Sequence, residues 1–252
     1  MGRATVKAIA AQDDLRLAAA VDLVGLGEDA GDLAGVGASG VEVSGDLAAA
    51  LDQARPDVMV DFTSPRVVMG NVRTALERSV NCVVGTTGLS ETDLAEIAEL
   101  CQKHQAAALV SPNFSLGANL MMRFAQEAAK HFECAEIVEL HHDGKKDAPS
   151  GTALKTAQLM SEGRGTPWRA VPTEITKLEG VRGGQSQGVT IHSVRLPGLV
   201  AHQEVIFGGL GETLTIRHDS LTHESFTPGV LMAVREVVKR QGLTVGLDSL
   251  LK

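Results

Sequence analysis

The protein has 252 residues, of which 44% are hydrophobic and 21% charged, a composition that suits one large folded domain or two of modest size. Its formal net charge of −8 argues against non-specific binding to nucleic acids, because a phosphate polymer would be repelled. Small anions are not excluded, since they respond to the local charge of a site.

Apolar runs that end abruptly at a polar or glycine turn recur along the first half of the chain, at residues 15–22, 57–65, 80–88 and 107–115. Helical spacing separates the later runs: it relates Val68, Val72, Ala75 and Leu76, and then Leu94, Ile97 and Cys101. Ser90, with Asp93 three residues later, predicts a helix N-terminus. Non-alternating strands separated by helices predict a parallel sheet covered on both faces, and hence a doubly wound α/β fold.

In a doubly wound sheet, ligands bind outside the carboxyl ends of the strands. The polar residues at those ends are Asp22 and the segments 61–65, 85–88 and 111–115. Asp22 suits a carboxylate that binds a ribose hydroxyl, although a role in a turn or a helix cap is the simpler alternative. A strand should precede the glycine-rich turn of such a site, but this sequence begins at a helix starting near Met1, so we expect the first, central strand to be missing from it.

The second half of the chain has a different pattern. Residues 116–132 have helical periodicity, and residues 135–140 predict a strand that delivers His141 and His142 at its end. Residues 163–188 are rich in Gly, Pro, Ser and Gln, which predicts a long exposed connection.

Three strands and a helix are expected to follow this connection. The segments 188–196, 202–209 and 212–220 alternate in the manner of neighbouring antiparallel strands. Thr227 predicts the N-cap of a final helix, with Pro228 at its first position. The second half therefore predicts a smaller α+β domain.

The cysteine content and the hydropathy pattern favour a cytoplasmic protein. Cys82, Cys101 and Cys134 are far apart and form no CxxC pair, which suits buried thiols better than disulfides or zinc ligands. The most apolar early stretch, residues 15–27, contains Arg16 and Asp22 and is too short to cross a bilayer, so no signal peptide or membrane span is expected.

Residues 139–154, ELHHDGKKDAPSGTAL, concentrate proton donors beside a small-residue turn. Ser150, Gly151 and Thr152 are expected to open a helix, whose free N–H groups and positive dipole end attract anions. His141, His142 and Lys145 lie just upstream. Together they predict a pocket for a carboxylated substrate with a proton donor close to it.

Simpler interpretations exist for each part of this segment. Ser150 can serve only as a helix cap, and Lys145 with Lys146 can form a solvated surface pair. Adjacent histidines on a strand point to opposite faces, and neither a nearby cysteine nor HExxH spacing is present, so no metal site is expected. The segment also lacks the GxxxxGK order of a nucleotide-binding P-loop.

Residues 139–154 closely resemble the signature of the 4-hydroxy-tetrahydrodipicolinate reductase (dihydrodipicolinate reductase) family of the diaminopimelate and lysine pathway. The resemblance continues through VDFTSP, VVGTTG, SPNFSLGANL, VRLPGLVAHQEVIFG and GETLTIRHDS, covers nearly the whole chain, and is greatest to the actinobacterial members. It implies a Rossmann-like dinucleotide-binding domain at 1–113 and 224–252, and a mixed-sheet domain for substrate binding and tetramerisation at 114–223. It also implies reduction of the cyclic substrate by NADH or NADPH with loss of water.

The resemblance assigns roles to individual residues. His141 matches the proposed acid/base, Lys145 the proposed proton donor and His142 a substrate contact, while Ser150 with Gly151 and Thr152 matches the turn that binds a substrate carboxylate. Asp22 matches the acidic residue at the adenosine ribose. The other cofactor contacts implied are Met1, Gly85, Thr86, Thr87, Ser111, Pro112, Asn113 and Phe114.

Two features depart from the family pattern. Only the final Met-Gly of the glycine fingerprint GxxGRMG is present, as Met1 and Gly2. Leu23 follows Asp22 where relatives that prefer NADPH often carry a basic residue, so NADH is expected to serve at least as well as NADPH. Two other hypotheses stay open: a non-catalytic NAD-binding regulator on the same fold, and a metal-dependent hydrolase that uses the histidine pair.

Overall fold

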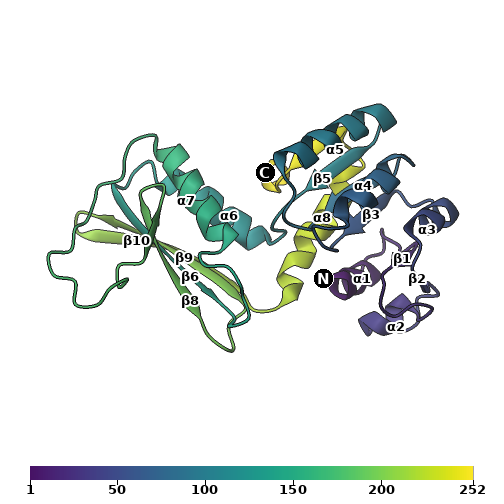
Figure 1. The fold of residues 1–252 in the computed structure, drawn as a ribbon, viewed down its shortest axis with the longest axis horizontal. Helices are drawn as coiled ribbons and strands as arrows, with labels where there is room; N and C mark the ends of the chain where they lie inside the picture. Colours follow the sequence, from purple (N-terminus) through teal and green to yellow (C-terminus); the bar gives the residue numbers. More distant parts are fainter. Residues whose placement is uncertain (252) are drawn as a thin grey trace. The chain divides into compact units, whose positions relative to one another are not determined.

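The computed structural model describes residues 1–251, which form two compact units (Figure 1). Unit 1 contains residues 1–115 and the segment from Phe226 onward, and unit 2 contains residues 116–225. The domain boundaries expected from the sequence, after residues 113 and 223, lie two positions before these divisions.

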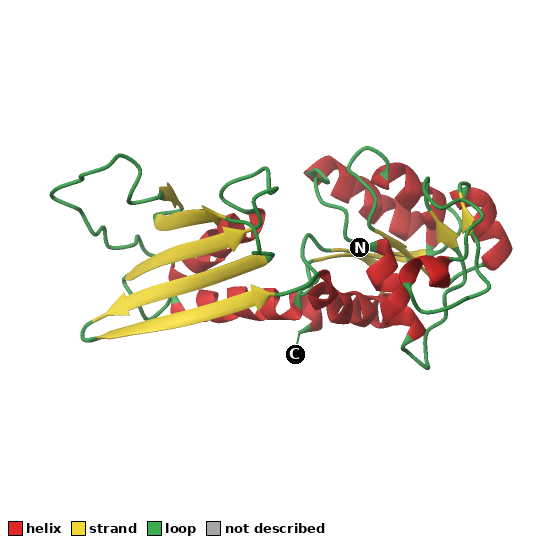
Figure 2. Ribbon diagram, turned by 90° about the horizontal axis from the view of Figure 1, so that it is seen from below, coloured by secondary structure: helices red, strands yellow, loops and turns green. Residues whose placement is uncertain are grey.

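Unit 1 is built on a parallel sheet of four strands in the order β11-β5-β4-β3. The strands are β3 (Val58–Asp61), β4 (Asn81–Val84), β5 (Ala107–Val110) and β11 (Gly242–Val245). Helices α4 (Val68–Leu76) and α5 (Glu91–His104) pack together on one face, and α8 (Thr227–Val237) packs on the other face together with α1 (Gly2–Ala10) (Figures 1 and 2). All four residues of β5 are buried, which explains why this strand shows no alternation in sequence.

Strand β1 (Ala20–Val21) pairs in parallel with β2 (Val43–Ser44) in a separate two-stranded sheet, and it is not hydrogen-bonded to β3. The strand expected over 15–22 is therefore much shorter than its apolar run. Helices α2 (Ala30–Ala34) and α3 (Leu47–Ala54) flank β2 in sequence. Strand β11, which completes the four-stranded sheet, was not expected from the sequence.

Of the helix N-termini predicted at Ser90 and Thr227, the first agrees with the structure and the second does not. The predicted N-terminus of α5 is confirmed: the Ser90 hydroxyl accepts from the Asp93 N–H, and the Asp93 carboxylate accepts from the Ser90 N–H at 2.8 Å. The prediction of Thr227 as the N-cap of α8 was wrong. Thr227 is the first helical residue and Phe226 is the cap, because the short 3₁₀ helix η1 (His223–Phe226) runs directly into α8.

Unit 2 contains a five-stranded mixed sheet in the order β10-β9-β6-β8-β7. The strands are β6 (Cys134–His141), β7 (Gly184–Ser186), β8 (Val189–Arg195), β9 (Ala201–Gly209) and β10 (Glu212–Ser220). Both helices, α6 (Leu116–Ala128) and α7 (Gly151–Arg164), lie on one face of this sheet (Figure 2). Ile137, Val205, Phe207 and Met160 are fully buried between these layers.

The expected pairing of β8 with β9 was wrong, because β6 lies between them. β6 pairs in parallel with β8 and antiparallel with β9. Strands β8 and β9 therefore both pair with β6, the strand that ends in His141. The exposed connection expected over 163–188 is shorter, since α7 extends to Arg164 and β7 begins at Gly184.

Candidate active site

Strand β6 directs alternate side chains toward the helices of unit 2, and the last two of these are Glu139 and His141. Ile137, one step earlier on this face, is fully buried in the core. In the parallel pairing with β8, Glu139 lies opposite Ser193 and His141 lies opposite Arg195. The sheet therefore brings a carboxylate, an imidazole and a guanidinium together at one end.

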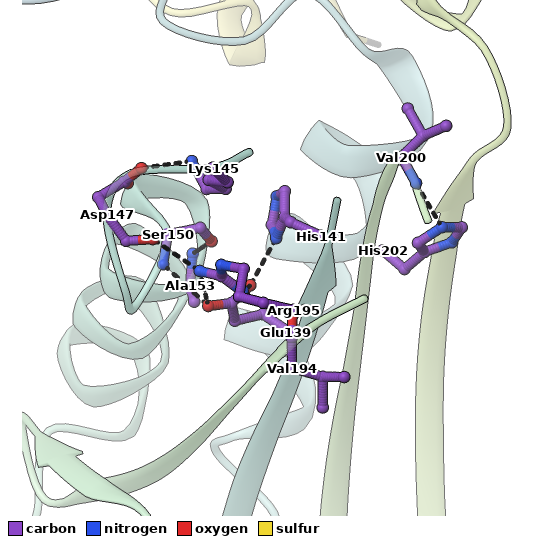
Figure 3. Close-up of polar contacts among 10 residues, drawn as sticks. All are labelled: Glu139, His141, Lys145, Asp147, Ser150, Ala153, Val194, Arg195, Val200 and His202. Carbon is purple, nitrogen blue, oxygen red and sulfur yellow. Dashed lines mark hydrogen bonds and ion pairs between the residues drawn. The ribbon is translucent and has the colours of Figure 1, made fainter. Parts of the chain in front are cut away.

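The Glu139 carboxylate is the centre of this cluster, and its side chain is fully buried. Arg195 donates from Nη1 to Oε2 at 2.9 Å and from Nη2 to Oε1 at 2.8 Å, which is a bidentate ion pair. The Nδ1 atom of His141 lies 2.5 Å from Oε2, and the backbone N–H of Ser150 donates to Oε1 at 3.3 Å. Figure 3 shows His141, Arg195 and the start of α7 converging on this carboxylate.

The charges of this cluster affect both ionisable groups on β6. Burial raises the pKa of Glu139, but hydrogen bonds from Arg195, Ser193 and His141 outweigh burial and leave that pKa below its ordinary value. Burial lowers the pKa of His141 below 6.5, against the opposing effect of Glu139. At neutral pH the carboxyl is therefore ionised and the imidazole of the free protein is mainly neutral.

Loop 142–150 places Lys145 beside this cluster. Lys145 Nζ donates to Asp147 Oδ1 at 2.7 Å, and the Asp147 carbonyl accepts from Arg195 Nη2 at 2.7 Å, so the loop is tied to the buried ion pair. The hydrogen bond from Lys145 lowers the pKa of Asp147. His142 follows the strand and is exposed, unlike His141, whose side chain is 13% exposed. The two adjacent histidines therefore lie in different environments.

Ser150, Gly151 and Thr152 begin helix α7, as expected from the sequence. The Ser150 hydroxyl is buried and accepts from the Ala153 N–H at 3.2 Å, so this side chain caps the helix. Gly151 is exposed, and a Cβ at this position would meet no atom within 4 Å. A carboxylate can therefore approach the backbone at Gly151 closely, at the positive end of the helix dipole.

Helix α7 is also tied to the sheet through its first two turns. The Thr156 hydroxyl donates to the Thr152 carbonyl at 2.7 Å and accepts from Gln203 Nε2 of β9 at 2.7 Å. Gln203 and Thr156 are both buried. These contacts fix the helix start that carries Gly151.

In unit 1, the residues expected to bind a cofactor lie after the parallel strands β1, β4 and β5, except for Met1, which precedes α1. Asp22 follows β1 and is exposed; its Oδ1 accepts from the N–H groups of Leu23 at 2.7 Å and Val24 at 3.1 Å. Within residues 1–251, its Oδ2 accepts no hydrogen bond. Met1 is the N-cap of α1, and a Cβ at Gly2 would meet no atom within 4 Å.

The loops after β4 and β5 each contain both buried and exposed residues. Thr86 is buried, whereas Thr87 is exposed. Ser111 is buried and donates from its hydroxyl to the Asn113 carbonyl at 2.9 Å. Phe114 is buried, Pro112 is exposed, and Asn113 is half-buried.

Asp61, at the end of β3, is buried and connects the loop after β3 with the loop after β4. Its Oδ1 accepts from the Thr63 N–H at 3.0 Å, the Thr63 hydroxyl at 2.8 Å and the Thr86 hydroxyl at 2.6 Å, and its Oδ2 accepts from Asn71 Nδ2 at 2.8 Å. The Thr86 hydroxyl is thus used within the protein. Asp61 holds the loop after β3 against the loop after β4.

Gly85 allows close packing at the same edge of the sheet. A Cβ at Gly85 would lie 2.0 Å from Cε1 of Phe62, so no larger residue fits without movement of that ring. Phe62 in turn packs edge-on against Phe114, with ring centroids 5.8 Å apart. The turn after β4 is therefore shaped by an aromatic pair that supports it.

Several groups of unit 1 have chemistry that suits a dinucleotide. Asp22 offers a carboxylate oxygen to a ribose hydroxyl, and the start of α1 offers open backbone N–H groups to phosphate. Gly85 and Gly88, which has a φ of 89°, keep the turn after β4 free of bulky side chains. Among residues 1–251, no group of three or more His, Cys, Asp or Glu side chains is arranged to hold a metal ion, and no helix is long and apolar enough to cross a membrane.

Models of the dihydrodipicolinate reductase N-terminus and C-terminus match residues 1–114 and 117–251 of this chain. The chain belongs to the dihydrodipicolinate reductase family. Its match to curated members covers their length almost completely, since it spans 95% of the 4-hydroxy-tetrahydrodipicolinate reductase of Desulfitobacterium hafniense (strain DSM 10664 / DCB-2) at 50% identity over 253 residues. The enzyme of the same name from Moorella thermoacetica is 50% identical over 252 residues, which is all of this chain and 94% of that protein.

Solved structures agree with this family assignment. A dipicolinate-bound dihydrodipicolinate reductase from Paenisporosarcina sp. TG-14 is 39% identical and superposes with a TM-score of 0.87, over 99% of this chain and 95% of that one. An amine dehydrogenase from Mycobacterium smegmatis has a TM-score of 0.65 at 15% identity, over 96% of this chain and 91% of that one, a likeness of fold alone. The doubly wound fold with a separate mixed-sheet domain is thereby confirmed.

Three residues that organise the site of this dihydrodipicolinate reductase family member were not predicted from its sequence. Glu139 could have been found, because it lies two positions before His141 on a predicted strand and must share its face. Arg195 could not, because its role depends on β8 being the parallel neighbour of β6. Asp61 was noticed only as the end of a strand, and its network depends on contacts from 63, 71 and 86.

Proposed function

We propose that the protein is an NAD(P)H-dependent oxidoreductase that reduces 4-hydroxy-tetrahydrodipicolinate to tetrahydrodipicolinate in diaminopimelate and lysine biosynthesis. The observation that carries the proposal is the buried Glu139, which holds His141 next to the loop of Lys145 and the open helix start at Gly151. The names of relatives at 50% identity and the dipicolinate in a related structure support the same substrate class.

The substrate is a ring with two carboxylates, and unit 2 offers a separate partner to each. Gly151 and Thr152 at the start of α7 bind one carboxylate through backbone N–H groups and the Thr152 hydroxyl, aided by the helix dipole. His142 and Lys145 supply hydrogen bonds and positive charge to the other. The Ser150 hydroxyl serves this site by capping α7, where it accepts from the Ala153 N–H, and not by contacting the substrate.

Unit 1 holds the cofactor in this proposal. Asp22 binds the adenosine ribose, Met1 at the start of α1 lies near the pyrophosphate, and the loops 85–87 and 111–114 surround the nicotinamide half. When bound, the reduced nicotinamide supplies the hydride. Asp22 would repel a 2′-phosphate and Leu23 offers it no charge, so NADH serves at least as well as NADPH.

The reaction adds a hydride and a proton to the substrate and releases water, so the protein must supply one proton. His141 supplies it. Burial lowers the His141 pKa in the free protein, but a dianionic ring bound nearby favours the charged imidazolium, which can donate the proton. Lys145 stabilises the negative charge that develops as the hydride arrives. Glu139 remains ionised throughout, because Arg195 holds it.

The proposal also includes the oligomeric state of the protein and its location in the cell. The face of the unit 2 sheet that α6 and α7 leave uncovered provides a surface for a homotetramer, which size-exclusion chromatography with light scattering tests. Unit 2 then serves substrate binding and tetramerisation, and unit 1 dinucleotide binding. We propose a cytoplasmic enzyme.

A coupled assay tests the proposed function. Dihydrodipicolinate synthase generates the substrate, and the decrease in reduced-cofactor absorbance is followed with NADH and with NADPH. The proposal requires oxidation that depends on both substrate and this protein and that continues with EDTA present. Cofactor binding without turnover would instead favour a non-catalytic NAD-binding regulator on the same fold.

A further inference from the structure

Glu139 has contacts that the proposed function does not require of it. It is a fully buried carboxylate on the strand that carries His141, and every polar group in contact with it is able to donate a hydrogen bond. Burying several hydrogen-bond donors around one carboxyl group costs free energy unless the carboxylate stays ionised and accepts from all of them. A buried structural ion pair would need Arg195 alone, yet this one also contacts the imidazole and the start of α7.

We propose that Glu139 is a positioning residue of the active site: its carboxylate accepts the Nδ1–H of His141, so that the reaction exchanges its proton at Nε2, while Arg195 holds the carboxylate in place. This inference rests on the proposed function of His141 as the acid. It adds which ring nitrogen is used and which side chain determines that choice.

The geometry supports one tautomer of His141. An ionised carboxylate has no proton to donate, so the nitrogen that lies 2.5 Å from it must carry the hydrogen. Within unit 2, no side chain or backbone group is hydrogen-bonded to Nε2. The ring is therefore held at one nitrogen and is open at the other, which is the arrangement that a proton donor requires.

The same carboxylate also sets the position of the predicted carboxylate-binding turn. Its Oε1 accepts from the Ser150 N–H at 3.3 Å, while Arg195 Nη2 contacts both Oε1 and the carbonyl of Asp147. One buried ion pair thus anchors His141, the loop that carries Lys145, and the first turn of α7. Loss of Glu139 should affect both proton transfer and substrate binding.

Charged groups face His141 from three places. Glu139 lies on its own strand, Arg195 on β8, and Lys145 on the following loop. Its partner on β9 is the uncharged Ala201. Glu139 is the single anion among these groups and raises the pKa of His141, whereas the two cations lower it. Removing the Glu139 charge must therefore make His141 harder to protonate.

The first test is the pH dependence of kcat/KM for Glu139→Gln. An acid must be protonated to act, so activity falls as pH rises through the pKa of His141. Without the anion this limb should move down by about one pH unit, so the wild-type to variant ratio grows by about tenfold from low to high pH. A ratio that is constant across pH would mean that Glu139 has only a structural role, and would overturn the proposal.

Two further variants sharpen this comparison. Glu139→Asp keeps the charge and should return the high-pH limb toward its wild-type position, even if turnover is lower. Glu136→Gln is the matched control, because Glu136 lies on the same strand, points to the other face, and contacts His192 Nε2 at 2.7 Å. Its high-pH limb should stay where the wild-type limb lies; a shift equal to that of Glu139→Gln would remove the proposed specificity.

The second test does not use turnover, so its failure can be distinguished from failure of the proposed function. Nitrogen-15 NMR of labelled imidazoles identifies the protonated nitrogen of each neutral histidine, and His141→Asn assigns the signal. Wild-type His141 should carry its hydrogen on Nδ1, and Glu139→Gln should give a mixture of tautomers. If wild-type His141 carries its hydrogen on Nε2, the proposal is wrong, whether or not the variant folds.

Discussion

Replacing Asp61 with alanine should destabilise unit 1 strongly. The buried carboxylate accepts hydrogen bonds from the Thr63 backbone, the Thr63 hydroxyl, the Thr86 hydroxyl and Asn71. Alanine removes both carboxylate oxygens that accept these hydrogen bonds. Water cannot fully replace them, because residue 61 is only 3% exposed. With about 1–3 kcal/mol for each donor left without a partner, and partial relaxation of the two hydroxyls, the expected loss is about 4 kcal/mol.

Thermal unfolding followed by circular dichroism measures this loss. For a protein of this size, about 4 kcal/mol corresponds to a decrease in Tm of about 10 °C. Asp57→Ala is the matched control, because Asp57 is an exposed carboxylate just before the same strand, and its Tm should stay within about 2 °C of wild type. If Asp61→Ala also melted within that range, the network around Asp61 would not hold the two loops together.

Three other predictions concern catalysis. His141→Gln should lower kcat by about 10²-fold or more, because glutamine cannot donate a proton; an unchanged kcat in steady-state assays would refute the role of His141. The wild-type kcat/KM for NADH should equal or exceed that for NADPH, and Leu23→Arg should move the ratio toward NADPH by supplying a cation for the 2′-phosphate; a strong NADPH preference of the wild type contradicts this. Finally, kcat/KM should fall as pH rises through a midpoint below 6.5, since burial lowers the His141 pKa in the free enzyme. The midpoint for kcat should lie at higher pH, because the bound dianion favours the imidazolium. Coincident midpoints would contradict this effect of the dianion.

The sequence predicted those parts of the fold whose local pattern agrees with their tertiary environment. The strands around residues 81 and 107 are apolar because the sheet buries both of their faces, whereas the strand at 58–61 is half-buried over its first three residues. The Ser90–Asp93 cap forms from contacts within a single turn. The order of strands in unit 2 could not be predicted, because alternation reports only which face is buried. Placing β6 between β8 and β9 is a long-range choice of partner.

In the candidate site, too, residues that are close in sequence could be predicted, whereas contacts between distant segments could not. His141, Lys145 and the Ser150–Thr152 turn are close in sequence, so the motif revealed them together. Ser150 and Thr86 were predicted to contact the substrate and the cofactor. In the structure both residues are buried, the Ser150 hydroxyl accepts from the Ala153 N–H, and the Thr86 hydroxyl donates to Asp61. Arg195 reaches Glu139 across 56 residues of sequence, and no local pattern indicates such a pair.

The central claim is that this protein reduces a hydroxylated cyclic dicarboxylate with hydride from a nicotinamide cofactor. Mass spectrometry of the product, combined with the absorbance of the reduced cofactor, measures this directly. We predict that each equivalent of NADH oxidised gives an equivalent of product that has lost one oxygen atom relative to the substrate, and that His141→Gln greatly slows both changes together. A protein that binds NADH but leaves the substrate mass unchanged would contradict the account.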